Sequence, residues 1–234
     1  MSLLIALTII LGITVLLTVL HLKLKLSLRF VPYALTAASV IAPIAFLLRK
    51  MGYDFGVIEG RDPVMLLFYA LFAIGLCIQL LSFLFLRYFV YPSKECSEPF
   101  FIVLYTLWLS LGMVTVELLL QPTGEDFLLP LLKVAGHLTL AAVFGYFIGM
   151  SKFAESPEQN FTYLNSGLGA AIIVQGLQEY FILEHNYPNL ILLILGTGFI
   201  AMGLVAYLLR QKLQDKKEIS PQELLEELYP EDRD

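Results

Sequence analysis

The distribution of apolar residues constrains this chain more than any other feature of its sequence. Apolar windows predict seven membrane spans, near residues 2–20, 30–48, 66–88, 100–121, 127–150, 165–183 and 189–209. A helix needs about 20 apolar residues to cross a bilayer, so seven crossings would use about 140 of the 234 residues. We therefore expect an all-α, polytopic membrane helix bundle over residues 1–211, followed by a cytoplasmic tail over residues 212–234.

Composition excludes several other classes of protein. Hydrophobic residues make up 58% of the chain and charged residues 15%, whereas a soluble domain has about 45–50% and about 25%. An ordinary cytosolic enzyme and a disordered chain are therefore excluded. The net charge is −5 and the basic residues form no stripe, so no nucleic-acid partner is expected. Cys77 and Cys96 suggest neither a disulfide nor a thiolate metal site.

Basic residues in the connectors predict that the N-terminus lies outside and the C-terminus inside. In this orientation the inner segments hold eleven Lys and Arg residues, whereas the outer connectors hold three, Arg49, Lys50 and Arg61. Lys and Arg are enriched in cytoplasmic loops, so the imbalance favours this orientation. The third span has the least certain start, because Asp62-Pro63 is also a signal for a longer or broken helix.

The last 20 residues are acidic and predict a short helix. Residues 215–234 carry eight of the 20 acids but only three of the 15 bases. Ser220, Pro221 and Glu223 form a helix-start signal, and one side of the helix would then carry Leu224, Leu225 and Leu228. Anionic lipid would repel such a helix. It would dock on a partner or on the basic loops, or remain a solvated helix that aids solubility.

Three ionisable residues inside the predicted spans need an explanation, because each costs roughly 2.5–3.5 kcal/mol at the bilayer centre. They are Glu117, Lys133 and His137. At about 1.5 Å per residue, Glu117 and His137 fall within about two helical turns of the level of Gln79 and Gln175, in the outer half of the bilayer. Lys133 shares a helix face with His137, four residues later. The spacing therefore predicts one buried polar cluster.

Two interpretations of this cluster remain open. In the structural one, Glu117 pairs with Lys133 or His137, and polar contacts hold the helices together. In the functional one, the residues form a hydrolytic or metal site, with Glu117 as base or ligand and His137 as ligand or acid. A catalytic zinc site usually has three protein ligands. Only Glu117 and His137 are good donors here, so no metal or other cofactor is expected.

Glycine spacing and the lack of symmetry add two further expectations. Gly145 and Gly149 form a small-xxx-small pair that would allow close helix packing.

No sustained internal repeat is present and the number of predicted spans is odd, which weakens the interpretation as a transporter built on inverted repeats. A channel or transporter stays as a third interpretation, although its polar residues should line both halves of the bilayer.

Three stretches between about Gly75 and Phe181 resemble the PrsW family of bacterial intramembrane proteases. The first begins at Arg87-Tyr-Phe-Val-Tyr-Pro and runs to Glu117, similar to the family's VYP…DEPxDGIxY and LGFAxxEN segments. The second, residues 136–153, is similar to H…GxxxGxA+F, and the third, residues 170–177, to A…HG. The resemblance implies a helical bundle in the bacterial inner (cytoplasmic) membrane. It also implies a hydrolytic site of acidic residues and histidines, acting with a metal or as a glutamic-type hydrolase.

The chain departs from the family's motifs at most signature positions. The acid pair and the lysine of E-E-x-x-K fall on Ile78, Gln79 and Ser82. The aspartate of the DG step falls on Phe101 and the asparagine after the third glutamate on Leu118. The later histidine falls on Gln175. Only Glu117 and His137 match. Amides keep such a cluster polar without the desolvation cost of a carboxylate.

These departures lead us to expect a catalytically inactive relative, a pseudoprotease. It would bind or scaffold another membrane protein, a transmembrane segment or lipid, as a subunit of a membrane complex. The alternative is an active intramembrane protease with a reduced site. In that case Glu117 would activate water, His137 would orient it or hold a metal, and Lys133 would stabilise the oxyanion.

Overall fold

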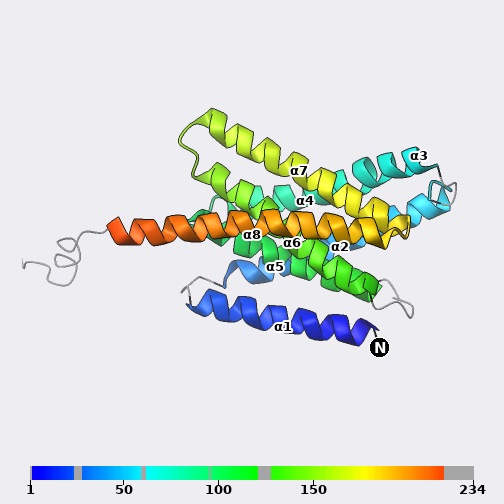
Figure 1. Ribbon diagram of the computed structural model, residues 1–234, viewed down its shortest axis with the longest axis horizontal. Coiled ribbons are helices and arrows are strands. Elements are labelled where there is room, and N and C mark those ends of the chain that lie inside the picture. The colour runs from blue at the N-terminus through cyan, green and yellow to red at the C-terminus, as the bar shows by residue number, and fades with distance from the viewer. Residues whose placement is uncertain (1, 24–27, 59–61, 95, 121–127, 219–234) are drawn as a thin grey trace, which may run out of the picture.

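The computed structural model describes residues 2–23, 28–58, 62–94, 96–120 and 128–218, and every regular element in these ranges is helical (Figure 1). The unbroken helices are α1 (Ser2–Lys23), α2 (Phe30–Asp54), α5 (Pro99–Leu120), α6 (Leu128–Lys152), α7 (Pro157–Leu183) and α8 (Tyr187–Glu218). Between α2 and α5 runs one helix in four parts: α3 (Pro63–Phe68), the π-helical η1 (Tyr69–Gly75), α4 (Leu76–Phe85) and the π-helical η2 (Leu86–Val90).

Six helical segments in the described residues are long and apolar enough to cross a membrane. They comprise α2, the composite helix Pro63–Val90, α5, α6, α7 and the Tyr187–Arg210 part of α8. The prediction of an all-helical, multi-pass membrane protein is confirmed at this level. The first predicted span forms α1, whose Leu7–Lys23 part is a shorter apolar helix, so its crossing of the membrane stays a prediction.

Local signals explain where two of the helices begin. Asp62 caps α3 by accepting a hydrogen bond from the Val64 backbone N–H at 3.0 Å, with Pro63 in the first turn. The third span therefore starts earlier than residue 66. Ser156 caps α7 in the same way, accepting from the Gln159 backbone N–H at 3.2 Å. As a result α7 begins eight residues before the predicted position 165.

The largest correction concerns the end of α2. We predicted that this span ends near residue 48, with Arg49 in an outer connector, but α2 continues to Asp54 and buries Arg49. No proline stands between residue 48 and Asp54, and the single glycine there, Gly52, is buried within the helix. Gly56, with its φ of +70°, follows the helix end. A hydropathy profile predicts that a span ends at a charged residue. Arg49 instead remains inside the bundle, because it pairs there with buried carboxylates.

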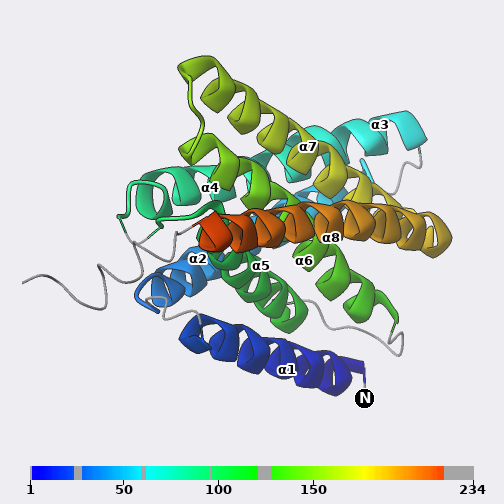
Figure 2. The ribbon, with the colours of Figure 1, turned by 60° about the vertical axis from the view of Figure 1, so that its left-hand side comes forward.

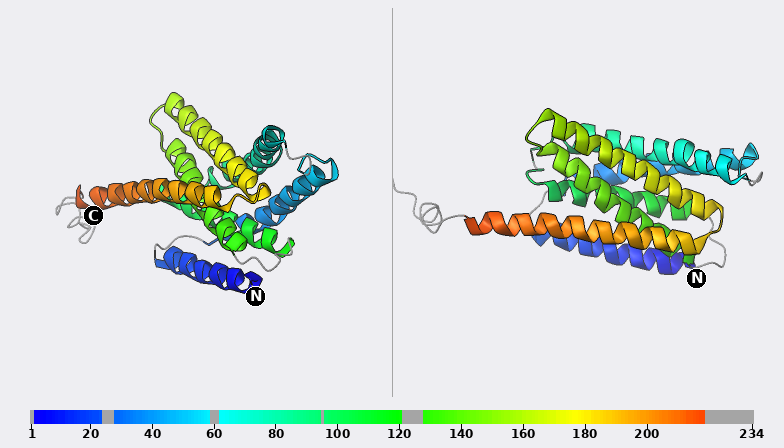
Figure 3. Two further views of the ribbon diagram at one scale, coloured as in Figure 1. Left: turned by 45° about the vertical axis from the view of Figure 1, so that its right-hand side comes forward. Right: turned by 45° about the horizontal axis from the view of Figure 1, so that its top comes forward.

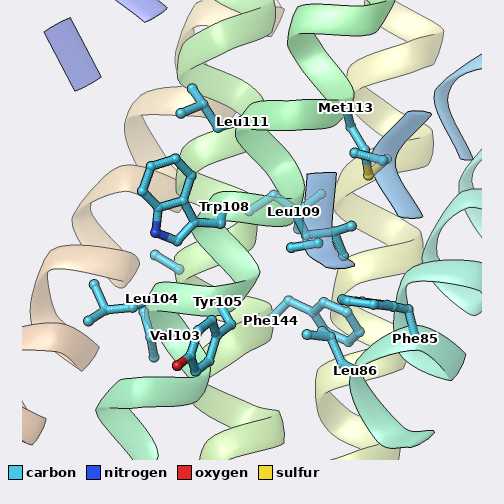
Figure 4. Close-up of a cluster of buried hydrophobic side chains, with 14 of the residues drawn as sticks. Phe85, Leu86, Val103, Leu104, Tyr105, Trp108, Leu109, Leu111, Met113 and Phe144 are labelled. Atoms are coloured by element: carbon cyan, nitrogen blue, oxygen red, sulfur yellow. The ribbon is translucent and has the colours of Figure 1, made fainter. Parts of the chain in front are cut away.

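The most buried helix is α5, which is apolar on most of its surface, as expected of a central helix, and carries Glu117 near its end. It packs against α2 and α6; α6 packs against α7; and α7 packs against η1, so that these segments and α4 surround a common interior. Around α5, the core contains aromatic and large aliphatic side chains, including Phe85, Leu86, Tyr105, Trp108, Leu109, Met113 and Phe144 (Figure 4).

The first and last helices lie on the outside of this arrangement (Figures 2 and 3). Helix α1 contacts α5 and α6, while α8 lies along α6 and α7. At one end of the bundle, here named the cluster end, α2, α5 and α7 end and α6 begins; this is the right-hand end in Figure 1. Helix α8 extends beyond its neighbours at the opposite end.

Helix α6 approaches α5 closely through two glycines. A Cβ atom on Gly145 would lie 2.8 Å from the Cα of Val103, and one on Gly149 would lie 2.7 Å from the backbone oxygen of Pro99. Both distances are shorter than real Cβ contacts. The absence of a side chain at these two positions is therefore what lets the helix backbones meet.

Candidate functional site

An arginine joins three helices through buried ion pairs near the cluster end. Arg49 of α2 donates from Nε and Nη2 to the two carboxylate oxygens of Glu179 on α7, at 2.8 Å and 2.5 Å. The same Nη2 donates to Glu117 Oε2 on α5 at 3.0 Å. The exposed fractions are 4% for Arg49, 0% for Glu117 and 1% for Glu179. The two-point contact with Glu179 is the strong, geometrically specific form of an arginine–carboxylate pair.

Helix α6 adds two basic side chains beside Glu117. Lys133 Nζ lies 4.0 Å from Glu117 Oε2, and His137 Nε2 lies 3.6 Å from Glu117 Oε1. We predicted Lys133 or His137 as the partner of Glu117, and both are near, but the closest cation is Arg49. The charges of Arg49 and Lys133 balance those of the two carboxylates, so the cluster is neutral when His137 is neutral.

Two glutamines extend the cluster toward α4. Gln175 Nε2 donates to Glu179 Oε1 at 3.2 Å, and Gln79 Nε2 donates to Gln175 Oε1 at 3.4 Å. A continuous polar chain therefore runs from Gln79 through Gln175 and Glu179 to Arg49. Because every member lies inside the bundle, the amides supply hydrogen bonds that water cannot.

The other predicted site positions are placed differently. Ile78 and Leu118 are buried apolar residues, and Ser82 Oγ lies 3.8 Å from the sulfur of Met113. Phe101 is 16 residues before Glu117 on α5, roughly 24 Å away at about 1.5 Å per residue, so it belongs to the core at the other end. Leu224, Leu225 and Leu228 lie outside the described residues.

A small cavity adjoins the cluster on the side of α4. Its volume is about 20 Å³, which is enough for about one water molecule. His137 lines it together with the polar side chains Gln79, Ser82, Thr106 and Ser110. Ser110 also donates to the His137 backbone oxygen at 2.8 Å, which fixes the two helices at this point. His137 therefore lies between Glu117 and a water-sized space whose wall is partly polar and partly apolar.

The donor set limits what metal could bind here. Among the residues that the structure describes, no group of three or more His, Cys, Asp and Glu residues is placed to hold a metal ion. Glu117 and His137 remain the best pair of donors, at 3.6 Å from each other. A catalytic metal site usually needs a third protein ligand.

Sequence reasoning missed two members of the cluster, Arg49 and Glu179. Glu179 lies inside the predicted span 165–183, four residues after Gln175 and on the same helix face, which was a usable signal. Arg49 gave a weaker signal, since an arginine at a span end normally marks the interface. Only the fold brings it to two acids that are 68 and 130 residues away.

A second polar network holds the opposite end of the bundle together. Asn160 Nδ2 of α7 donates to Tyr91 Oη and to the Ser151 backbone oxygen, both at 2.7 Å. Lys152 Nζ donates to the Ser93 backbone oxygen at 2.6 Å. Tyr91 and Lys152 belong to segments that carry the PrsW resemblance. Their contacts here are structural, because they tie the ends of η2, α6 and α7 together.

Comparison with known proteins finds a partial match. The chain is 30% identical over 130 residues to protease PrsW of Geobacillus kaustophilus, and the match covers 48% of this chain and 56% of that protein. The chain thus spans little more than half the length of this relative. No family model matches the chain, and no solved structure matches it. The helical segments and this match together describe a multi-pass membrane protein with a weak similarity to protease PrsW.

Proposed function

We propose that this chain is a catalytically inactive relative of PrsW-type intramembrane proteases that binds or scaffolds another membrane protein. The observation that carries the proposal is the pairing of Arg49 with both Glu117 and Glu179. A general base must be free to accept a proton from water. Glu117 is fully buried and held by a guanidinium, and breaking a buried pair of this kind is costly.

The amides support the same proposal. Gln79 and Gln175 stand where the family resemblance implies an acid and a histidine, and they bond to each other at 3.4 Å. An amide neither ionises nor binds metal well, yet it satisfies buried neighbours. The resulting network joins charged groups and amides mainly to one another, with Arg49 Nη1 and Glu117 Oε1 as its buried atoms that have no hydrogen-bond partner among the described residues. Such mutual pairing suits a scaffold better than a hydrolase. No cofactor is expected.

The proposed setting is the bacterial inner membrane, with the N-terminus outside and the C-terminus inside. Because Arg49 is buried against acids, it no longer counts as a loop charge. The outer connectors then keep Lys50 and Arg61, against eleven basic residues in the inner segments. The test is labelling of single cysteines by an impermeant maleimide in whole cells. Gly56→Cys should react from outside and Lys94→Cys only after permeabilisation.

The absence of proteolysis is tested in proteoliposomes. Single-span candidate substrates are reconstituted with the wild-type chain and with Glu117→Gln, and the products are analysed by mass spectrometry. We expect the wild type and Glu117→Gln to give the same low level of cleavage products. Cleavage by the wild type that is lost in Glu117→Gln would overturn the proposal.

The runner-up, an active protease with a reduced site, has one observation in its favour. His137 lies between Glu117 and the cavity of about 20 Å³, so a single water could sit beside an imidazole that is itself 3.6 Å from a carboxylate. In this case Glu117 would activate water through or beside His137. The discriminating variant is Ser110→Val, which changes the cavity wall and leaves the ion pairs in place. It should alter cleavage only if the cavity holds the nucleophilic water.

A further inference from the structure

We infer that the cluster end of the bundle carries a binding pocket for the phosphate headgroup of an anionic lipid. The pocket has a volume of about 380 Å³, within the usual range for ligand sites. Helix α2, the start of α6 and the turn between α7 and α8 form its walls. It lies directly over the ionic cluster, because Arg49 and Lys133 belong both to the cluster and to the lining.

The charge of the lining selects an anion. The polar side chains around the pocket are Arg49, Lys50, Lys133 and His185, together with Tyr53. No acid is among the described lining residues, although Glu117 and Glu179 lie beyond Arg49. Basic side chains from two helices therefore converge on one space. Glu117 and Glu179 balance the charges of Arg49 and Lys133, so Lys50 adds the net positive charge that a phosphate group there would meet.

Arg49 can serve the acids and an anion at the same time. Its Nε and Nη2 donate to Glu179 and Glu117, but its Nη1 has no hydrogen-bond partner among the described residues. A guanidinium presents its donors as a planar fork, so Nη1 stays available while the other nitrogens are engaged. A buried donor without a partner costs free energy. Nη1 is itself buried, so a small shift of the Arg49 side chain toward the pocket would be needed for a phosphate oxygen to accept from it and remove that cost.

The apolar part of the lining favours a lipid over a free anion. Phe46, Leu129 and Ile182 line the same space as the basic residues, so an acyl chain could lie against them. Arg49 is five residues before the end of α2 and Lys133 five residues after the start of α6. At about 1.5 Å per residue each lies roughly 7.5 Å from its helix end. Both residues therefore lie within two helical turns of the cluster end, where the bundle would meet the headgroups of a bilayer.

This inference goes beyond the proposed function, which names a membrane protein as the partner and no lipid. Proteolysis and protein partners are measured by cleavage and by co-purification, which do not require the pocket. If the protein binds no anionic lipid while the cleavage assay gives its expected result, the lipid pocket is overturned and the proposed function is not.

The test compares the full-length protein in mild detergent with two lysine variants. Lys50→Gln removes an exposed charge at the pocket, and Lys94→Gln removes an exposed charge at the opposite end as the matched control. Thermal unfolding is followed while phosphatidylglycerol, phosphatidylcholine or inorganic phosphate is added. Native mass spectrometry counts the lipids that stay bound.

We expect phosphatidylglycerol to raise the unfolding midpoint and one molecule to remain bound per chain. Lys50→Gln should weaken this binding about fivefold, the usual effect of one lysine near an anionic headgroup, and Lys94→Gln should not. Equal shifts with phosphatidylcholine, or equal behaviour of the two variants, would overturn the pocket. An equal shift with inorganic phosphate alone would overturn the assignment to a lipid in favour of a free anion.

Discussion

Arg49 Nη2 lies 3.0 Å from Glu117 Oε2, although the two residues are 68 positions apart on α2 and α5. This contact places a cation at hydrogen-bond distance from Glu117, whereas Lys133 Nζ and His137 Nε2 lie farther away, at 4.0 Å and 3.6 Å. It also couples the charge of α5 to that of α7, because Arg49 bonds Glu179 as well. The stability of the bundle and the state of the candidate site therefore depend on the same side chain.

Replacing Arg49 should destabilise the bundle more than replacing its neighbour. Arg49→Leu leaves two buried carboxylates without their guanidinium, which should lower the free energy of unfolding by about 3–5 kcal/mol. Thermal and denaturant unfolding in detergent measure the effect. Lys50→Gln, one residue later and exposed, is the matched control and should change stability by less than about 0.5 kcal/mol. An Arg49→Leu protein that melts like wild type would contradict the ion-pair network.

Glu117→Leu should lower stability or expression and leave any proteolysis readout unchanged. The single variant leaves Arg49 and Lys133 facing only Glu179, an excess of one buried positive charge. The double variant Arg49→Leu, Glu117→Leu keeps one charge of each sign. It should therefore cost less than the sum of the two single changes, by about 0.5–3 kcal/mol. Intact yield and melting of Glu117→Leu would show that the buried-pair role is wrong.

The level of the polar cluster could be predicted from the sequence, but its membership could not. Counting residues from the helix ends placed Glu117 and His137 at one depth with the two glutamines, and these side chains lie near one another in the structure. Their roles stay predictions. Arg49 was not predicted as a member of the cluster, because a hydropathy profile takes an arginine as the end of a span. Whether an arginine is buried depends on partners far along the chain, here Glu117 and Glu179.

Phe101 and Gly176, which both fall within the family's motifs, have packing contacts in the structure. The motif implied that the position of Phe101 belongs with the site, yet it lies near the far end of α5 and packs in the core. Gly176, which follows Gln175, permits close packing instead: a Cβ atom there would lie 2.7 Å from the Cα of Leu71. The sequence shows that a glycine is present, but only the fold shows which backbone it meets.

The small-xxx-small pair on α6 can be tested by adding one methyl group. Gly149→Ala would place a Cβ atom 2.7 Å from the Pro99 backbone oxygen, and backbone cannot move aside as a side chain can. We expect a loss of about 1–3 kcal/mol in the free energy of unfolding. Gly203→Ala on α8 is the control, because a Cβ atom there meets nothing within 4 Å. Equal melting temperatures of the two variants would show that Gly149 is not needed for close packing of α6 on α5.

Deleting residues 218–234 should spare the membrane fold and weaken recovery of a partner. The part of α8 that packs on α6 and α7 lies well before the deletion, with Ile194, Ala201 and Leu208 buried and Thr197 Oγ1 donating to Thr139 Oγ1 at 3.3 Å. Thermal unfolding in detergent should therefore not change. Co-purification from membranes in mild detergent measures partner binding.

Two full-length variants separate the apolar side of the predicted tail helix from its charge. Replacing Leu224, Leu225 and Leu228 by serine removes the apolar side and leaves the acids, whereas Glu223→Gln and Glu226→Gln together do the reverse. If the tail helix docks through its leucines, only the serine variant should lose the partner, because a helix face buries apolar area and leaves its charges in water. Partner recovery that survives the truncation would show that the tail has no docking role.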